Sequence, residues 1–176
     1  MTGGRYNVAN GFVALKNNGS TVHNTATGAF ALFYNTTADN NTANGAYALF
    51  NNTTGTENTG TGYHALYGIT TGSFNTAIGY RAGYLTSAVA PLIANSTPES
   101  SVFLGHNTRS KTAADTNQIV IGANAIGEGS NTARIGDANV TALYVGGNGA
   151  GVVLNSPNGT AYKITVSDAG AITATA

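Results

Sequence analysis

The chain has 176 residues, a length that suits one domain and leaves little room for two. Alanine (28), threonine (26), glycine (24) and asparagine (22) supply 100 of these residues, only 8% are charged, and the net charge is zero. These values exclude a basic nucleic-acid-binding surface and a cysteine-based disulfide or metal scaffold, and the 9% of aromatic residues argues against disorder. Glycine, asparagine and threonine are poor helix formers, and no apolar run approaches the roughly 18 residues of a membrane span, so we expect an all-β fold without membrane insertion.

A 17-residue repeat begins near the N-terminus. Each of the first five copies has an asparagine, a glycine four residues later and an alanine three residues after that, and leucine follows in four copies. The repeat residues are Asn7, Asn24, Asn41, Asn58 and Asn75; Gly11, Gly28, Gly45, Gly62 and Gly79; and Leu15, Leu32, Leu49 and Leu66, with Gly83 in the fifth leucine position. A fixed period of this kind indicates a repeat architecture.

Each repeat is predicted to form one coil of a parallel β-roll, or β-solenoid. Small and large residues alternate over 25–27 and 30–32, which predicts two short strands and two turns per coil. The glycine predicts a turn with positive φ or a close approach of two backbones. The alanines predict a thin interior that excludes large side chains.

The register continues in altered form and then stops. Hydrophobic-glycine pairs recur up to Ile135-Gly136, after an insertion at 85–100. From about Val140 four strand-like runs follow, at 140–145, 151–154, 162–166 and 171–175, with turn residues between the last three. We therefore predict a repeat region at 1–139 and a small C-terminal β-strand module at 140–176.

Each coil also carries a leucine and one or two aromatic residues. We expect a thin roll to leave these groups uncovered, and a long exposed apolar stripe would cause aggregation. Packing equivalent stripes of several copies together would bury them, at about 1.5–3 kcal/mol for each large side chain. The sequence therefore favours a closed oligomer, without fixing the number of copies.

The repeats resemble those in the head domains of trimeric autotransporter adhesins and, still more, related repeats of bacteriophage tail fibres. The resemblance rests on segments such as Asn75-Thr-Ala-Ile-Gly-Tyr-Arg-Ala-Gly and Ser101-Val-Phe-Leu-Gly, and on the ending Ser156-Pro-Asn-Gly-Thr-Ala-Tyr. It implies a left-handed roll that trimerises about the fibre axis and attaches to a surface. Adhesin head repeats are typically shorter than the unit found here, and the N-terminus lacks a signal peptide pattern, so the resemblance favours a phage or phage-derived fibre.

The sequence offers little for catalysis. Asp39 and Glu57 are separated by about one repeat and could lie on adjacent coils, yet polar turn residues explain them better than a glycosidase pair does. His23, His64 and His106 are isolated, so we expect no metal site, no cofactor and no enzyme activity.

Three functions follow from this sequence. The first is a non-enzymatic trimeric fibre that attaches a phage or phage-like particle to a bacterial surface. Its partners would be other tail or fibre proteins and a surface glycan or protein receptor, on a virion tail or the surface of an extracellular particle. The second is a filament subunit that assembles head-to-tail, and the third an ice-binding solenoid with threonine ladders. The insertion at 85–100 could bind a receptor or pack as a collar, and no receptor-binding residue is assigned.

Overall fold

The computed structural model describes residues 4–84 and 97–140 in full, together with the backbone of three later strands. The chain divides into two compact units, Met1–Asn139 and Val140–Ala176, and the boundary falls where the 17-residue repeat ends. Most of the insertion predicted at 85–100 lies outside the described residues, as do most of the predicted strand at 140–145 and the turns after residues 155 and 166.

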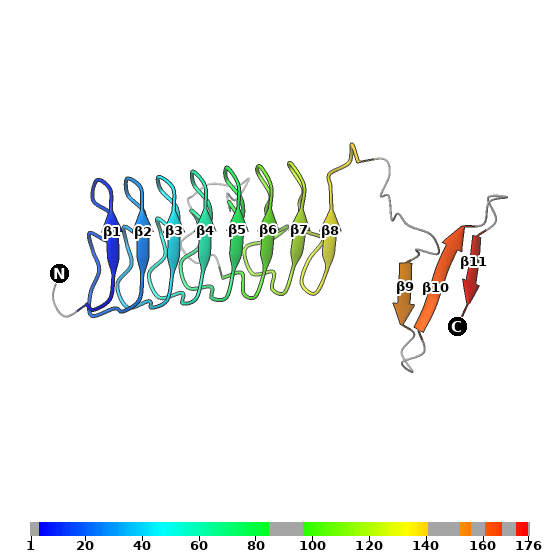
Figure 1. Cartoon of the computed structure of the whole chain (residues 1–176), viewed down its shortest axis with the longest axis horizontal. Helices are drawn as coiled ribbons and strands as arrows, with labels where there is room; N and C mark the ends of the chain where they lie inside the picture. The colour runs from blue at the N-terminus through cyan, green and yellow to red at the C-terminus, as the bar shows by residue number, and fades with distance from the viewer. Residues whose placement is uncertain (1–3, 85–96, 141–151, 156–160, 167–171, 176) are drawn as a thin grey trace. The chain divides into compact units, whose positions relative to one another are not determined.

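The first unit is a parallel β-solenoid of about seven turns. Eight strands of three residues each lie side by side in chain order and form one sheet (Figure 1). The strands are β1 (Val8–Asn10), β2 (Thr25–Thr27), β3 (Thr42–Asn44), β4 (Thr59–Thr61), β5 (Thr76–Ile78), β6 (Val102–Leu104), β7 (Ile119–Ile121) and β8 (Ala133–Ile135). The described residues contain no helix, and hence none that could span a membrane.

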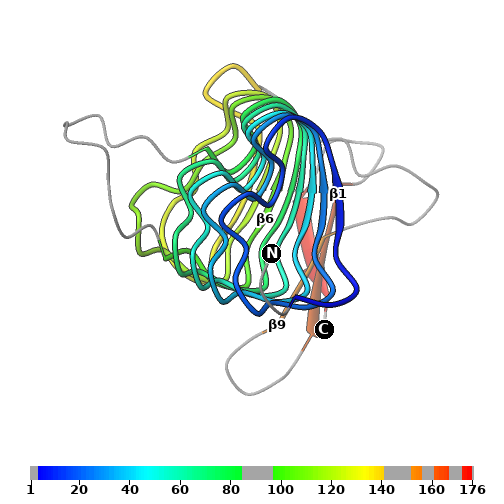
Figure 2. The same cartoon turned by 90° about the vertical axis from the view of Figure 1, so that its left-hand side faces the viewer.

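The sheet register follows the sequence repeat. Val8 pairs with Thr25, its equivalent in the next repeat, and the same step relates each pair of neighbours from β1 to β5 and from β6 to β7. Residues 85–96 lengthen the step between β5 and β6, where Thr76 pairs with Val102. Viewed toward its N-terminal end, the solenoid shows successive coils that follow similar paths, each offset from the one before (Figure 2).

The predicted second strand of each coil is wrong. Residues 30–32 form a turn, because Phe30 and Leu32 have φ values of 59° and 49° rather than those of an extended chain. Phe30 is partly exposed, whereas Ala31 and Leu32 are both completely buried, so two consecutive side chains face the core, as a turn allows and a strand does not. The turns of adjacent coils are also joined by backbone hydrogen bonds, as from Leu32 N to Ala48 O at 3.1 Å.

The interior is wider than the alanine content suggests. The leucines Leu15, Leu32, Leu49 and Leu66 are completely buried within the chain's own core, so they are not part of an uncovered stripe. The middle residue of each strand faces them and is small from β1 to β5. One leucine per coil thus fills the space that small strand residues leave open, and the expectation of a thin interior is wrong.

The repeated asparagines form a ladder through the solenoid. The Oδ1 atom of each one accepts a hydrogen bond from the backbone N–H of the next, as between Asn41 and Asn58 at 2.9 Å. The Nδ2 group donates to a carbonyl oxygen further along, as from Asn58 to Gly72 at 2.8 Å. Asn24, Asn41, Asn58 and Asn75 are fully buried, so each satisfies backbone groups that water cannot reach.

A second asparagine ladder was not predicted from the sequence. Asn18, Asn35 and Asn52 recur with the same period and are also buried, and Asn35 Nδ2 donates to Asn18 Oδ1 at 3.1 Å. The same amide donates to Ala38 O at 2.9 Å. The spacing was visible in the sequence, and buried Ile69 takes this position in the fourth coil.

The repeated glycines have both a positive φ and a close backbone contact, the two alternatives that the sequence suggested for them. Their φ values lie between 126° and 146° from Gly11 to Gly79, and each stacks against the next coil. A Cβ atom on Gly62 would lie 2.4 Å from the carbonyl oxygen of Gly79. Glycine is required here because backbone packs directly on backbone.

The second unit contains a three-stranded antiparallel sheet. Its strands are β9 (Val152–Asn155), β10 (Ala161–Val166) and β11 (Ile172–Thr175), with β10 in the middle. Lys163 pairs with Val153 on one side and with Thr175 on the other.

Candidate interaction surfaces

The first and third residues of each strand form two parallel rows on the outer face of the sheet. Within one row, neighbouring side chains are separated by about 4.8 Å, the spacing of paired strands. The first row is Val8, Thr25, Thr42, Thr59, Thr76, Val102, Ile119 and Ala133, and the second is Asn10, Thr27, Asn44, Thr61, Ile78, Leu104, Ile121 and Ile135.

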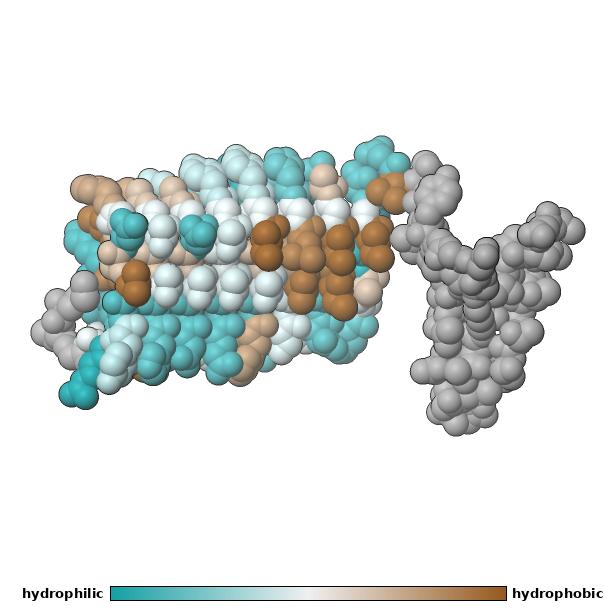
Figure 3. All heavy atoms as spheres, viewed as in Figure 1, coloured by the Kyte–Doolittle hydropathy of each residue, from teal (hydrophilic) through white to brown (hydrophobic). Residues whose placement is uncertain are grey.

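The outer face changes chemistry along the solenoid. Threonine and asparagine cover it from β2 to β4, whereas large aliphatic side chains cover it from β5 to β8 (Figure 3). The apolar patch consists of Ile78, Val102, Leu104, Ile119, Ile121 and Ile135. Ile78, Ile119 and Ile135 are 49%, 46% and 53% exposed, so the single chain leaves much of this patch in water.

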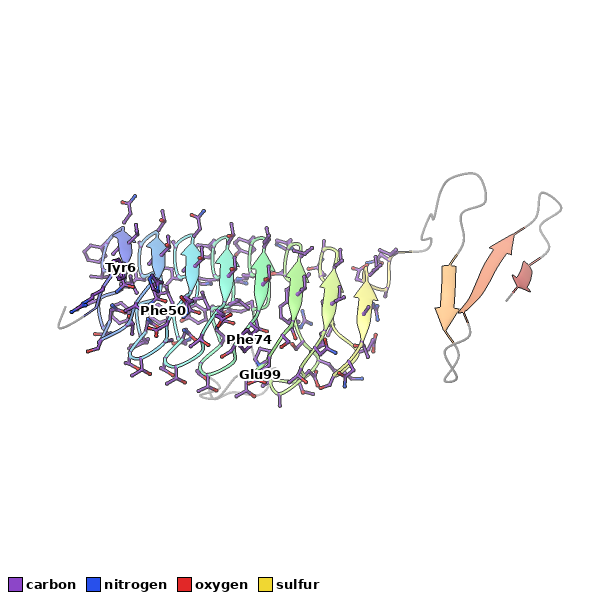
Figure 4. The ribbon with its side chains drawn as sticks, turned by 60° about the horizontal axis from the view of Figure 1, so that its bottom comes forward. Tyr6, Phe50, Phe74 and Glu99 are labelled. Atoms are coloured by element: carbon purple, nitrogen blue, oxygen red, sulfur yellow. The ribbon has the colours of Figure 1, made fainter. Side chains whose placement is uncertain are left out.

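A second surface runs along the turns that follow the strands. Rings from successive coils stack on one another there, as in the pair Phe50 and Tyr67, whose centroids are 5.2 Å apart. Figure 4 marks Phe50 within this aromatic band. The band consists of Phe12, Phe30, Phe33, Tyr34, Tyr47, Phe50, Tyr63, His64, Tyr67, Tyr80, Tyr84 and His106. Most of these rings are half-buried by their neighbours, so much of the band is already covered within one chain.

His64 lies inside the aromatic band, close to Arg81. Its ring stacks on Tyr63 at 4.0 Å between centroids, and its Nδ1 atom is buried without a hydrogen-bond partner among the described residues. Burial, together with the positive charge of Arg81, lowers the pKa of His64 below 6.5. Burial likewise raises the pKa of Tyr67, so both groups are held in their neutral forms.

The stability of the solenoid is expected to decrease as the pH falls below 6.5. The unfolded chain takes up a proton at His64 before the folded chain does, because the folded pKa is the lower of the two, so protonation favours unfolding. Urea unfolding at a series of pH values measures this effect. His64→Phe should flatten the profile below pH 6.5, whereas His23→Phe, which alters an exposed histidine, should not. Equal profiles for the two variants would contradict the assignment.

The acidic residues singled out in the sequence have local structural roles. Asp39 Oδ1 accepts a hydrogen bond from Val22 N at 2.7 Å, and Glu57 N donates to the backbone oxygen of Asp39 at 3.2 Å. Their spacing in the sequence therefore does place the two residues on adjacent coils. The Asp39 carboxylate links its coil to the preceding one through Val22 N.

A charged side chain closes the core at its last coil. Arg134, the middle residue of β8, takes the inward position that Val120 occupies in β7. Its guanidinium group donates to Gly136 O at 2.8 Å and pairs with Glu128. Repeat proteins need such polar ends, because an apolar core must stop without exposing itself.

The fold places this chain among the β-solenoid repeat proteins. Comparison with family models, curated proteins and solved structures finds no match to the chain. The surfaces of the chain itself are therefore the guide to its function.

Proposed function

We propose that the chain is a non-enzymatic, homotrimeric fibre protein that attaches a phage or phage-like particle to a bacterial surface. The observation that carries the proposal is the apolar patch on the outer face of β5–β8. The proposed location is a virion tail or the surface of an extracellular particle, with other fibre proteins and a surface glycan or protein receptor as partners. The C-terminal unit would then be the terminal module of the fibre.

The apolar patch supports association of identical chains. Its residues come from four consecutive coils and lie in two straight rows on a rigid sheet. Burying a fully exposed side chain of this size stabilises a complex by about 1.5–3 kcal/mol. The three most exposed side chains of the patch are about half exposed and the other three less so, so each contributes only part of this free energy. Six of them on every copy still favour a closed oligomer around a common axis. A rigid solenoid with this interface forms a straight shaft, which suits a fibre.

A lysine in the apolar patch is expected to dissociate the trimer. Light scattering of the purified chain should give a mass of three times 17.7 kDa that does not change with concentration. Ile119→Lys should give the mass of one chain, because the ammonium group would be buried against apolar neighbours. The matched control is Thr54→Lys, which adds the same charge at an exposed turn. A monomeric wild-type chain would contradict the proposal, and a mass that keeps growing with concentration would support a head-to-tail filament instead.

Adsorption to bacteria tests the attachment function separately. Labelled wild-type protein should sediment with cells of a susceptible strain, and the monomeric Ile119→Lys variant should sediment less, because a trimer presents three copies of each binding surface. A stable trimer that adsorbs to no strain in a broad panel would leave only a structural role.

Ice binding is the second candidate, and a specific observation favours it. Thr25, Thr42, Thr59 and Thr76 form an unbroken row of four threonines on the outer face. The neighbouring row contains Asn44 and is therefore mixed, and the face becomes apolar from β5 onward. A monomer that shows thermal hysteresis would favour this candidate, and loss of hysteresis in Thr59→Tyr would confirm it.

A further inference from the structure

The aromatic band ends beside a small cavity. Tyr84 is the last ring of its column, and the next coil contributes Asn107 and Arg109 beside it instead of another ring. A cavity of about 170 Å³ lies at this point and is lined by Arg81, Tyr84, Asn107 and Arg109. No acidic side chain is among these lining residues.

The cavity carries positive charge without an internal partner. Arg81 and Arg109 form no ion pair with any residue that the structure describes. The guanidinium carbon of Arg81 lies 5.0 Å from the ring centroid of Tyr84 and 5.3 Å from that of Tyr80, which fixes the group between two rings. Its Nε atom is buried and has no hydrogen-bond partner within the described residues. Arg81, held in this way, and Arg109, which lines the same cavity, provide donors for an anion.

Exposed rings continue from the cavity along the surface. Tyr80 stacks on His106 with 5.1 Å between centroids and on Tyr63 with 5.5 Å, and all three are exposed. Because the rings stack face to face, their exposed edges form an apolar surface beside the charged residues, where Tyr80 adjoins Arg81 and His106 adjoins Asn107 in the chain. Aromatic walls with a few convergent polar groups are typical of small-molecule binding sites.

We infer that this site binds an acidic sugar of the hexuronic acid class. The two guanidinium groups donate to the carboxylate, and the sugar chain lies along the exposed edges of Tyr80 and His106. The side chain of Asn107, whose Nδ2 also donates to Asn124 Oδ1 at 3.3 Å, bonds a hydroxyl group. The cavity has room for a carboxylate and part of one pyranose ring. The site therefore selects acidic over neutral sugars by the negative charge of the carboxylate, and not by the shape of a whole ring. This inference deepens the proposed function, on which it rests, by naming the chemistry of the bacterial surface glycan.

Calorimetry with two matched hexamers tests the inference. The probes are hexagalacturonate and the same hexamer with its carboxylates reduced to alcohols, at about 0.15 M salt so that unspecific attraction is screened. The acidic hexamer is expected to bind at least about tenfold more tightly than the reduced one. Arg81→Gln and Arg109→Gln should each weaken its binding by roughly tenfold, and Arg109→Lys should fall between, because it keeps the charge and loses the planar fork.

Lys16→Gln is the matched control. It removes a cation that lies over Phe33 at 5.7 Å, in the same band but outside the cavity, so it should leave binding unchanged. Equal binding of the two hexamers, no binding of the acidic hexamer, or an equal loss in Lys16→Gln would each overturn the inference. Arg109→Gln keeps the test decisive if Arg81→Gln fails to fold.

Adsorption to cells separates this inference from the proposed function. A wild-type trimer whose adsorption is neither reduced by hexagalacturonate nor weakened in Arg109→Gln would overturn the acidic-sugar site and leave attachment standing. A chain that binds the acidic hexamer in solution but adsorbs to no cells would overturn attachment alone.

Discussion

Replacing Gly45 by alanine is expected to destabilise the solenoid by more than about 4 kcal/mol, enough to prevent folding of the central coils. A Cβ atom at this position would lie 2.6 Å from both the carbonyl carbon and the carbonyl oxygen of Gly62. Neither backbone can move away. Gly45 N donates a hydrogen bond to Thr27 O at 2.7 Å, and Gly62 is packed against Gly79. The clash would therefore separate two coils.

Gly129→Ala separates the clash from backbone strain. Gly129 also has a positive φ, of 119°, but a Cβ atom there would meet nothing within 4 Å. Strain alone costs about 1–3 kcal/mol, so this variant should remain folded and melt at a moderately lower temperature. Circular dichroism melts and urea titrations measure both variants. Equal losses in the two would show that strain, rather than coil stacking, explains the glycine repeat.

The 17-residue period was enough to predict the parallel sheet and its register. Each asparagine, glycine and leucine position recurs because every coil stacks on an equivalent copy, so one interaction is repeated along the solenoid. The second strand was wrong for a physical reason. The alternation of small and large residues at 30–32 does not report which side chains face inward. Ala31 and Leu32 are both buried, because the positive φ values of Phe30 and Leu32 turn the chain there.

The candidate surfaces could be predicted only in part. The threonine rows were visible as a repeat, and the structure places them on the outer face. The row of Ile78, Leu104, Ile121 and Ile135 was visible as hydrophobic-glycine pairs, but its exposure on the outer face beside Val102 and Ile119 was not predicted. The cavity beside Tyr84 arises because the next described coil places Asn107 and Arg109 there instead of a ring, a change of residue type that carries no periodic signal.

The interruption at Gly83 has a structural explanation in the next coil. Leucine fills the corresponding position in the four preceding coils, where the facing strand residue is alanine or glycine. In the next coil Phe103 occupies the inward position of β6 and is completely buried. A Cβ atom on Gly83 would lie 2.6 Å from Leu66 Cδ2 and 3.0 Å from Phe103 Cδ2, so the phenyl ring occupies part of the space that a fifth leucine would need.

Because Phe103 fills space that a leucine at position 83 would need, substitutions at residues 83 and 103 should be strongly coupled in the free energy of unfolding. Phe103→Ala should cost about 3–5 kcal/mol by leaving a cavity, and Gly83→Leu should also destabilise, because its side chain would meet the phenyl ring. The double variant Gly83→Leu/Phe103→Ala recreates the pairing of the earlier coils, and leucine already adopts the required positive φ at Leu66. It should therefore be more stable than either single variant.

A double-mutant cycle measured by urea unfolding gives the coupling directly. We expect a favourable interaction of about 1–3 kcal/mol between the two substitutions. Leu32→Ala, which opens a cavity in the same core several coils away, is the control and should be additive with Gly83→Leu to within about 0.5 kcal/mol. Additivity of the 83–103 pair would mean that the ring does not replace the leucine. The absence of leucine at position 83 would then need another explanation than the volume of Phe103.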